Sequence, residues 1–560
     1  MQLIDEIQWV LRNARLNALD PTLRSAAGFA QGNGVATPVH RAQVGRWERG
    51  HVVMTRHLVR RYEQVLHLDE GTLLTAVDRF GRARNPVRSV AVLSPADEPD
   101  TDRTLLLLER ALSEDRMTGL EWDELTDALG RIGRPLVRAS DWEALLRRLL
   151  EETSLGLGIG YAQRSEALAR LVGHARSGPL VAAMAAEVTG RPDAQFYNDP
   201  LGMLHHTDHP EAVSVVLDQL RRPTNPSVLR ACLIVLTTLV QGRRLDGEVR
   251  LEAARLAVQH LRDPDLPYRV HRGAANLVRA LGISAPRLAT VLTAEDRRVA
   301  ASIIRDGRAI SAEAFRTSMK RIRAELEEAG GHESIEEPVL AHLLETALGS
   351  TDEGERGTAL GILMVSPQAG VVGRVQARAL ADALGQGDVV AAHESLTILS
   401  WLGQAEDLDL FERVSLGPDT PTDVATTAGY VLGNAIEPSS PRRDARERAV
   451  ALRVAGIVAT GTGHDAGDHV RSLVYALGMR GRDDLLRALA DALPAEPDPE
   501  PELATGLATE LATGPDGRPA DPTIGDPADR PRPGPDGVAR GILGYWLGLP
   551  DHLRPDGEPA

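Results

Sequence analysis

Residues 37–50 read TPVHRAQVGRWERG, and this stretch decides how the first part of the chain folds. The pair Thr37-Pro38 combines an N-cap residue with a proline at the first helical position, so we expect a helix over 39–49. Gly50 then supplies the C-terminal stop, because glycine readily adopts the left-handed backbone that ends helices. The stretch therefore predicts one short helix with a defined start and end.

Four more short helices are predicted on either side of this one, which gives five within about 85 residues. They are a helix over 4–17 with Arg12 and Arg15 on its polar side, a helix that begins at Asp20-Pro21 and runs to roughly Ala30, a helix capped by Thr55 whose apolar stripe includes Leu58, Val59, Tyr62, Val65 and Leu66, and a helix marked by Leu73, Leu74, Val77 and Phe80.

The segment Val44–Gly50, followed by a helix that ends in Tyr62–Leu68, resembles the XRE family, the phage Cro and repressor class of helix-turn-helix proteins. That family has an aliphatic residue, two polar or small residues and then Trp-Glu-x-Gly at the end of its recognition helix. The resemblance covers about residues 3–80. It implies that the third helix enters the major groove of DNA while the second lies across the backbone.

By this resemblance, Arg41, Gln43 and Arg46 are the candidates for reading base edges. Ala42 leaves room for a thymine methyl group, and His40 or Thr37 contacts a phosphate at the helix N-terminus. Val44 and Trp47 are expected in the core, and Glu48 is expected to pair with a neighbouring arginine. Arginines that either contact phosphate or are merely solvated are Arg24, Arg49, Arg56, Arg60 and Arg61.

Charge is distributed unevenly along the chain. Residues 1–90 contain 13 arginines and 8 acidic residues, a net charge of +5, whereas the remainder holds 50 basic and 71 acidic residues, a net charge of −21. Almost all basic residues are arginine, with Lys320 the only lysine, a bias typical of GC-rich bacterial genomes. A nucleic-acid partner, double-stranded DNA by the resemblance, is therefore expected at the N-terminus.

An interdomain linker is predicted for residues 81–102, which contain three prolines and little helical pattern. Arginines near its start either follow the DNA backbone or form a solvated basic hinge. From 103 to 494 one amphipathic helix follows another, and low aromatic content with abundant Ala and Leu favours an all-α class. The arginines near the start of the linker are Arg79, Arg82, Arg84 and Arg88.

Two internal echoes indicate that the helices form stacked pairs. Residues 220–226 (LRRPTNP) recur as 261–267 (LRDPDLP), with both prolines in register. A shorter echo relates Ala347-Leu348-Gly349 to Ala383-Leu384-Gly385. Repeats of about 40 residues resemble HEAT or armadillo arrays, which curve into an α-solenoid. Such an array offers a concave surface to a protein, peptide or ligand.

The C-terminal part divides in two. Residues 495–535 are rich in Pro, Asp and Gly and are predicted to be disordered. Residues 536–560 are expected to form a short helix and a tail. The apolar segment Gly541–Leu547 either folds back as a cap or binds a partner.

The sequence contains no recognisable motif for catalysis, metal binding or cofactor binding. His205-His206-Thr207-Asp208-His209 lacks a distant cluster that would complete a zinc site. The lone Cys232 is expected to be a buried, inert thiol. No signal peptide and no run of 18 apolar residues is present, so the expected location is the cytoplasm, away from membranes.

These observations lead to one main hypothesis and two rivals. The main hypothesis is a sequence-specific transcriptional regulator that binds DNA through residues 1–80, as a homodimer by the resemblance, with a helical body for dimerisation, partner binding or signal sensing. The first rival is an interaction scaffold whose N-terminal domain serves for docking. The second is a nucleic-acid-processing helical enzyme.

Overall fold

The computed structural model describes residues 2–32, 39–93, 100–132, 135, 137–283, 303, 307–328, 337–435, 437, 439–460, 464–493 and 534–554. Within these ranges the regular elements are helices, and the β-bridge between Arg308 and Ser350 is isolated. The predicted all-α class is confirmed. None of the helices in these ranges combines the length and the apolar run that a membrane crossing requires.

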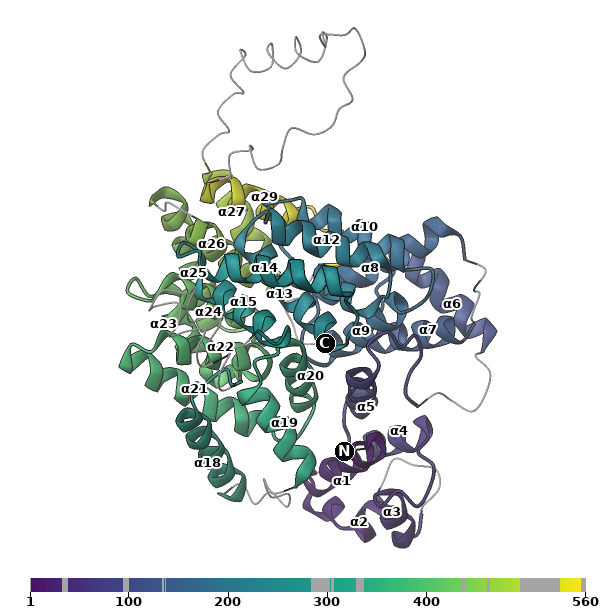
Figure 1. The fold of residues 1–560 in the computed structure, drawn as a ribbon. Coiled ribbons are helices and arrows are strands. Elements are labelled where there is room, and N and C mark those ends of the chain that lie inside the picture. The colour runs from purple at the N-terminus through teal and green to yellow at the C-terminus, as the bar shows by residue number, and fades with distance from the viewer. Residues whose placement is uncertain are drawn as a thin grey trace.

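Six short helical elements form the N-terminal unit at the lower right of Figure 1. The expected helix after Asp20 is split, because Asp20 caps a 3-10 turn and Ser25 caps the α-helix that follows. The predicted cap at Thr55 is confirmed, since its Oγ1 accepts a hydrogen bond of 3.2 Å from the Leu58 amide. The elements are α1 (Leu3–Leu16), η1 (Pro21–Arg24), α2 (Ala26–Gln31), α3 (Arg41–Trp47), α4 (Arg56–Val65) and α5 (Thr72–Arg84).

The first arm of the body consists of helices that pack in pairs against the preceding and following pair. Its core contains the buried Trp122, Trp142 and Cys232, and burial raises the pKa of the Cys232 thiol, as expected for an inert side chain. The elements are α6 (Thr101–Leu112), α7 (Gly119–Arg131), α8 (Ala139–Ser154), α9 (Gly158–Val172), α10 (Gly178–Thr189), α11 (Asn198–Gly202), η2 (Met203–His206), α12 (Pro210–Arg221), α13 (Pro226–Gln241), α14 (Gly247–Leu261) and α15 (Tyr268–Ala280).

The second arm continues in the same manner to the C-terminal helix. Its elements are α18 (Ala312–Glu328), α19 (Pro338–Gly349), α20 (Glu353–Met364), α21 (Ala369–Gln386), α22 (Val389–Leu402), η4 (Ala405–Asp407), α23 (Leu408–Leu416), α24 (Thr422–Asn434), α25 (Pro441–Thr460), α26 (His464–Gly478), α27 (Asp483–Ala492) and α29 (Pro535–Leu547). Residues 494–533, which hold most of the segment predicted to be disordered, lie outside the described residues.

In both sequence echoes the repeating unit is a pair of helices. Pro226 is the first residue of α13 and Pro267 is the N-cap of α15, so residues 220–226 and 261–267 are equivalent turns of successive pairs. The His260 ring at the end of α14 hydrogen-bonds the Leu220 carbonyl at the end of α12, at 2.8 Å. The shorter echo relates the pair α19–α20 to the pair α21–α22. The prediction of stacked helix pairs is therefore confirmed.

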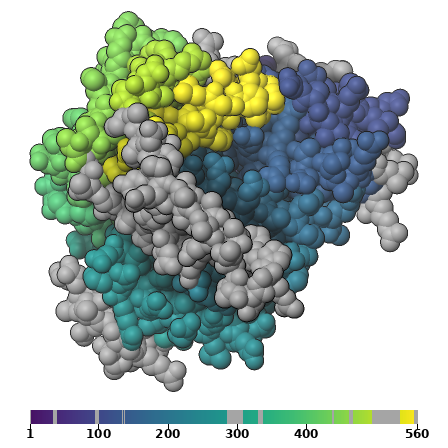
Figure 2. Space-filling model, turned by 90° about the horizontal axis from the view of Figure 1, so that it is seen from above, coloured from purple at the N-terminus to yellow at the C-terminus, as the bar shows by residue number. Residues whose placement is uncertain are grey.

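The two arms meet across their inner sides, and α29 joins them. Trp546 of α29 is buried and donates from Nε1 to the Gln195 side chain at 2.9 Å. Figure 2 shows the C-terminal segment in yellow between the blue first arm and the green second arm. Of the two alternatives for Gly541–Leu547, the structure has the segment folded back onto the body.

The N-terminal unit shares one apolar core with α18–α22 of the second arm. The two parts also exchange polar contacts, because the Asn13 and Gln368 side chains hydrogen-bond each other at 2.7 and 2.9 Å. Toward the first arm, Arg56 pairs with Asp123, and Arg170 bridges Asp123 and Asp78. The described residues of the N-terminal unit therefore contact the body on two sides.

Residues 85–93, which the sequence analysis places in a linker, form a packed strap across the body. The Ala91 amide donates to Asp127 at 2.9 Å, and the Val92 amide donates to Asp78 at 2.7 Å. The strap lies so close to α7 that a Cβ at Gly130 would come within 1.9 Å of the Ser89 carbonyl oxygen. Of the residues 81–102 predicted as an interdomain linker, 81–84 end α5, 101 and 102 begin α6, and 85–93 are packed, because prolines and lost periodicity report the end of a helix and not a lack of packing.

Candidate nucleic-acid interface

The helix α3 is short and closed at both ends by specific contacts. His40 is its N-cap, and His40 Nδ1 accepts a hydrogen bond from the Ala42 amide at 3.3 Å. Gly50 ends the turn with φ +70°, and the His51 amide then donates to the Arg46 carbonyl at 2.9 Å. The predicted stop at Gly50 is confirmed. The helix begins later than predicted, and Thr37 and Pro38 lie outside the described residues.

The inner face of α3 is anchored by apolar side chains. Val44 is 0% exposed and Trp47 is 5% exposed, so both are core residues as predicted. The Trp47 ring meets the Tyr62 ring edge-on at 6.2 Å, and Tyr62 in turn packs against Phe29 at 4.4 Å. These rings come from α2, α3 and α4, and they fix how α3 is rotated about its axis.

Glu48 at the C-cap of α3 forms a buried ionic cluster. Arg15 donates from Nε and Nη2 to the two Glu48 carboxylate oxygens at 2.6 and 2.7 Å. Tyr62 donates its hydroxyl to the same carboxylate at 3.1 Å. Burial raises the pKa of Tyr62 and the Glu48 charge raises it further, so the hydroxyl keeps the proton it donates. The expected pairing of Glu48 with an arginine is confirmed.

The position of Arg15 corrects one expectation. The helical pattern puts Arg15 on the polar, solvent-facing side of its helix, but the side chain is buried between α1 and α3. Arg12, on the same side, is half-buried and pairs with Glu337 at 3.2 Å. The polar face of α1 is therefore covered by other parts of the fold, which helical periodicity alone does not reveal.

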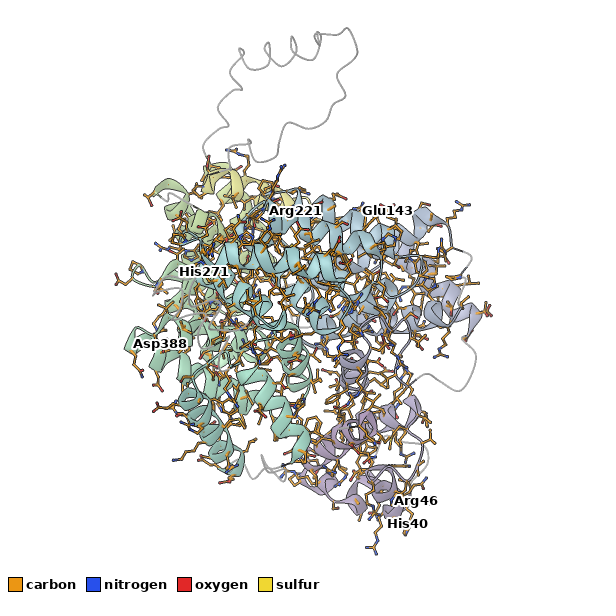
Figure 3. All side chains as sticks on the ribbon, viewed as in Figure 1. His40, Arg46, Glu143, Arg221, His271 and Asp388 are labelled. Atoms are coloured by element: carbon orange, nitrogen blue, oxygen red, sulfur yellow. The ribbon has the colours of Figure 1, made fainter. Side chains whose placement is uncertain are left out.

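The outer face of α3 carries the residues predicted to read DNA. All of them that the structure describes are exposed, and Figure 3 shows the labelled His40 and Arg46 at the outer edge of the molecule, away from the body. Within the described part of the chain, no side chain pairs with the guanidinium of Arg41 or Arg46. Thr37 lies outside the described residues, and the exposed set is His40, Arg41, Ala42, Gln43 and Arg46.

Three of the five arginines considered as phosphate contacts, Arg24, Arg49 and Arg56, differ in their surroundings. Arg49 is exposed, and its Nε donates to the Gly45 carbonyl at 2.8 Å. Arg24 is half-buried, and its Nε donates to the Ala18 carbonyl at 2.9 Å. Arg56 is only 8% exposed and pairs with Asp123, so its assignment as a phosphate contact is wrong. Desolvation and this carboxylate commit Arg56 to the protein interior.

The arginines at the start of the expected linker are likewise engaged by the protein. Arg82 pairs with Glu166 at 2.8 Å, and Arg84 pairs with Glu6 at 2.6 Å. Arg79 is buried beside Glu166, and Arg88 donates to backbone carbonyls of the strap, at 2.8 Å for Val90. They form neither of the two features expected of them, a phosphate track or a solvated hinge.

His205 and His206 are enclosed by the protein and contact each other and the strap. Their ring centres lie 3.8 Å apart with the ring planes tilted by 48°, and His206 Nδ1 contacts the Pro86 carbonyl of the strap at 2.8 Å. Burial and nearby arginines lower the pKa of His205 to about 4. Among the described residues, no group of three or more His, Cys, Asp or Glu side chains is arranged to hold a metal ion.

Comparison with known proteins adds no identification. No protein-family model matches the chain, and a search of curated proteins finds no match.

Proposed function

We propose that this protein binds double-stranded DNA sequence-specifically through α3 and regulates transcription. The observation that carries the proposal is the division of α3 into an anchored inner face and an outer face formed by Arg41, Gln43 and Arg46. Arginine can bond both acceptors of a guanine edge, and glutamine both polar groups of an adenine edge. The major groove admits one helix, so these three side chains reach bases from a single rigid support.

The charge distribution supports this placement. Residues 1–90 carry a net charge of +5 and the rest of the chain −21. The acidic body repels phosphate, so the favoured approach is to the N-terminal unit, where α3 lies at the edge of the molecule (Figure 1). Steering of this kind weakens as salt is added, whereas base-specific contacts keep their sequence preference.

The resemblance to XRE proteins extends the proposal to a homodimer on two half-sites, whose centres would lie about 34 Å apart along the duplex. The helical body would supply the surface that joins two copies, binds a partner or senses a signal. We place the regulator above the rival scaffold because the exposed side chains of α3 have the chemistry of base recognition.

The test is selection of bound sequences from a randomised duplex library by the full-length protein at about 150 mM salt. We expect one enriched motif. The double variant Arg41→Ala with Gln43→Ala should lose preference at two positions, at a cost of about 1–3 kcal/mol for each contact. The control is Arg262→Ala, which removes one exposed arginine from the body and should leave the motif unchanged.

Two results would contradict the proposal. An unchanged motif in the double variant would reject Arg41 and Gln43 as readers. Binding without any enriched sequence, lost as salt rises, would favour the interaction scaffold, because non-specific binding depends almost entirely on phosphate contacts.

A further inference from the structure

A cavity of about 830 Å³ lies where the inner helices of the two arms face one another. Its walls come from α9, α13, α20, α22, α24 and α26, which surround the middle of the molecule in Figure 1. Cavities that hold small organic molecules usually measure about 300–1,000 Å³. The space is therefore large enough for a ligand of several rings.

Aromatic side chains are concentrated on the cavity wall. The whole chain has only 6 Trp, 7 Tyr and 5 Phe, yet six of these residues line this one space. Tyr161 and Trp401 meet edge-on at 5.8 Å, and Tyr430 and Tyr475 lie 5.3 Å apart. Aromatic faces favour flat apolar or aromatic groups, through stacking and edge-to-face contact.

The cavity also has a polar side built by Arg230, Glu353 and Arg356. Arg230 pairs with Glu353 at 2.6 Å, and Arg356 pairs with Glu394 at 2.7 Å. Arg356 is only 1% exposed. Even so, Arg230 Nε and Arg356 Nη2 have no hydrogen-bond partner among the described residues, whereas Glu353 Oε1 lies 3.5 Å from Arg272 Nη1. Buried polar atoms are normally paired, so the two unpaired nitrogens indicate a missing partner.

The unpaired atoms indicate what kind of partner is missing. They are nitrogen donors, and Gln195 Nε2 on the same wall is a third donor that lacks a partner within the described ranges. A ligand that offers acceptor oxygens satisfies more of them than one that offers donors. His393 adds no charge, because burial and the surrounding arginines lower its pKa well below its ordinary value. The charged residues of the lining are Arg230, Arg269 and Arg356 and the acidic Asp199, Glu353 and Glu406.

We propose that this cavity binds a planar aromatic molecule of two or three rings that carries carboxylate or carbonyl oxygens. The rings lie against Tyr161 and Trp401, and the oxygens face Arg230 and Arg356. A cationic molecule of the same shape that offers only N–H donors is disfavoured, because it leaves the unpaired nitrogen donors of Arg230, Arg356 and Gln195 without an acceptor.

The N-terminal unit touches the walls of this cavity through α5. That helix packs on both α9 and α20. The Arg79 guanidinium lies 5.7 Å from the Trp401 ring centre and 3.6 Å from the Glu166 carboxylate. Gly361 permits this, because a Cβ there would come within 1.8 Å of Arg79 Nη1. A role for the ligand in regulation rests on the proposed function, whereas ligand binding itself does not.

The experiment is calorimetric titration of the full-length protein, without DNA, with anthraquinone-2-carboxylate. This probe has three fused rings, two carbonyls and a carboxylate. We expect saturable binding of one molecule per chain. Proflavine, a three-ring cation, should bind at least tenfold more weakly.

Two glycine variants locate the binding site. A Cβ at Gly357 would meet only the Trp401 ring, at 3.8 Å, so Gly357→Leu places its side chain in the cavity and should weaken probe binding at least tenfold. The matched control is Gly456→Leu on the exposed side of α25, where a Cβ meets nothing within 4 Å. It should bind as the parent does. Thermal unfolding establishes that both variants fold.

Arg230→Gln is a second variant that leaves the cavity size nearly unchanged, and it should lower the probe affinity at least fivefold. Its control is Arg221→Gln on the outer surface, which should leave the probe affinity unchanged. Absence of saturable binding, or equal binding by Gly357→Leu, would overturn the site. Equal affinity for proflavine would overturn the assigned ligand chemistry. None of these readouts involves DNA, so failure here is distinct from failure of the proposed function.

Discussion

The substitution Glu48→Ala tests whether the end of α3 serves the fold or DNA contact. The change removes a carboxylate that accepts two hydrogen bonds from Arg15 and one from Tyr62. Arg15 stays buried with the Arg24 carbonyl as its remaining acceptor. Removal of one partner from a buried pair typically costs about 3–5 kcal/mol, because the other charge is left uncompensated.

The measurement is native-state hydrogen exchange, followed on peptides that cover residues 41–65. We expect the free energy of local opening there to fall by about 3–5 kcal/mol. Peptides from α13 serve as the internal control and should exchange as in the parent protein. Because Glu48 faces inward, the selected DNA motif should keep its sequence while the fraction of protein able to bind falls.

A paired variant shows whether the loss comes from the stranded charge. Arg15→Met combined with Glu48→Leu removes both charges and should recover most of the protection, since apolar replacement of a buried pair is often neutral or stabilising. A loss below about 1 kcal/mol in Glu48→Ala would refute the reasoning, because that is the size expected of an exposed pair. So would a double variant no better than the single one.

Three further results are expected. Arg56→Ala should destabilise the protein by about 3 kcal/mol and leave the salt dependence of DNA binding unchanged. Arg49→Ala should reduce the slope of log affinity against log salt concentration by about one. Equal slopes in the two variants would reject this distinction. Burial opposes the charge of Asp123, but its two arginine partners lower its pKa to about 2. Its contribution to stability is therefore present above about pH 4 and lost as pH falls toward 2, so the difference in unfolding free energy between the parent and Asp123→Asn should shrink over that range, and a constant difference would contradict the assignment. We expect the cavity probe to change the DNA affinity of the parent protein through the contact between Arg79 and Trp401. Arg79→Met, which leaves Glu166 paired with Arg82, should keep the separate probe and DNA affinities within twofold but abolish that change; an undiminished change would show that the coupling takes another route.

The sequence predicted what depends on local chemistry. Prolines in register at 226 and 267 gave the helix pairs, Thr55 gave a cap, and the spacing of Val44 and Trp47 gave the buried side of α3. The cap and the buried side are each specified within one helix, and the prolines specify the same turn in two successive helix pairs. Such signals survive folding because later contacts add to them and do not replace them.

The failures arose where a distant part of the chain covers a polar surface. Arg15 and Arg56 have the spacing of solvated side chains, yet partners 33 and 67 residues away bury them. The cavity has no counterpart in the sequence, because Tyr161 and Trp401 belong to different arms of the body. The sequence shows only that aromatic residues are scarce. That scarcity points to the cavity only when the structure shows that six of these residues line it.

The strap at 85–93 has a consequence for the spacing between DNA half-sites that the protein would accept. A DNA-binding domain on a flexible linker tolerates extra base pairs between half-sites, because the linker can extend to cover the added distance. In the proposed homodimer, the strap and the shared core would hold α3 at a fixed distance from the surface that joins the two copies. Half-site spacing should therefore be as strict a requirement as base identity, and one inserted base pair, which rotates a half-site by about a tenth of a turn, should weaken binding sharply.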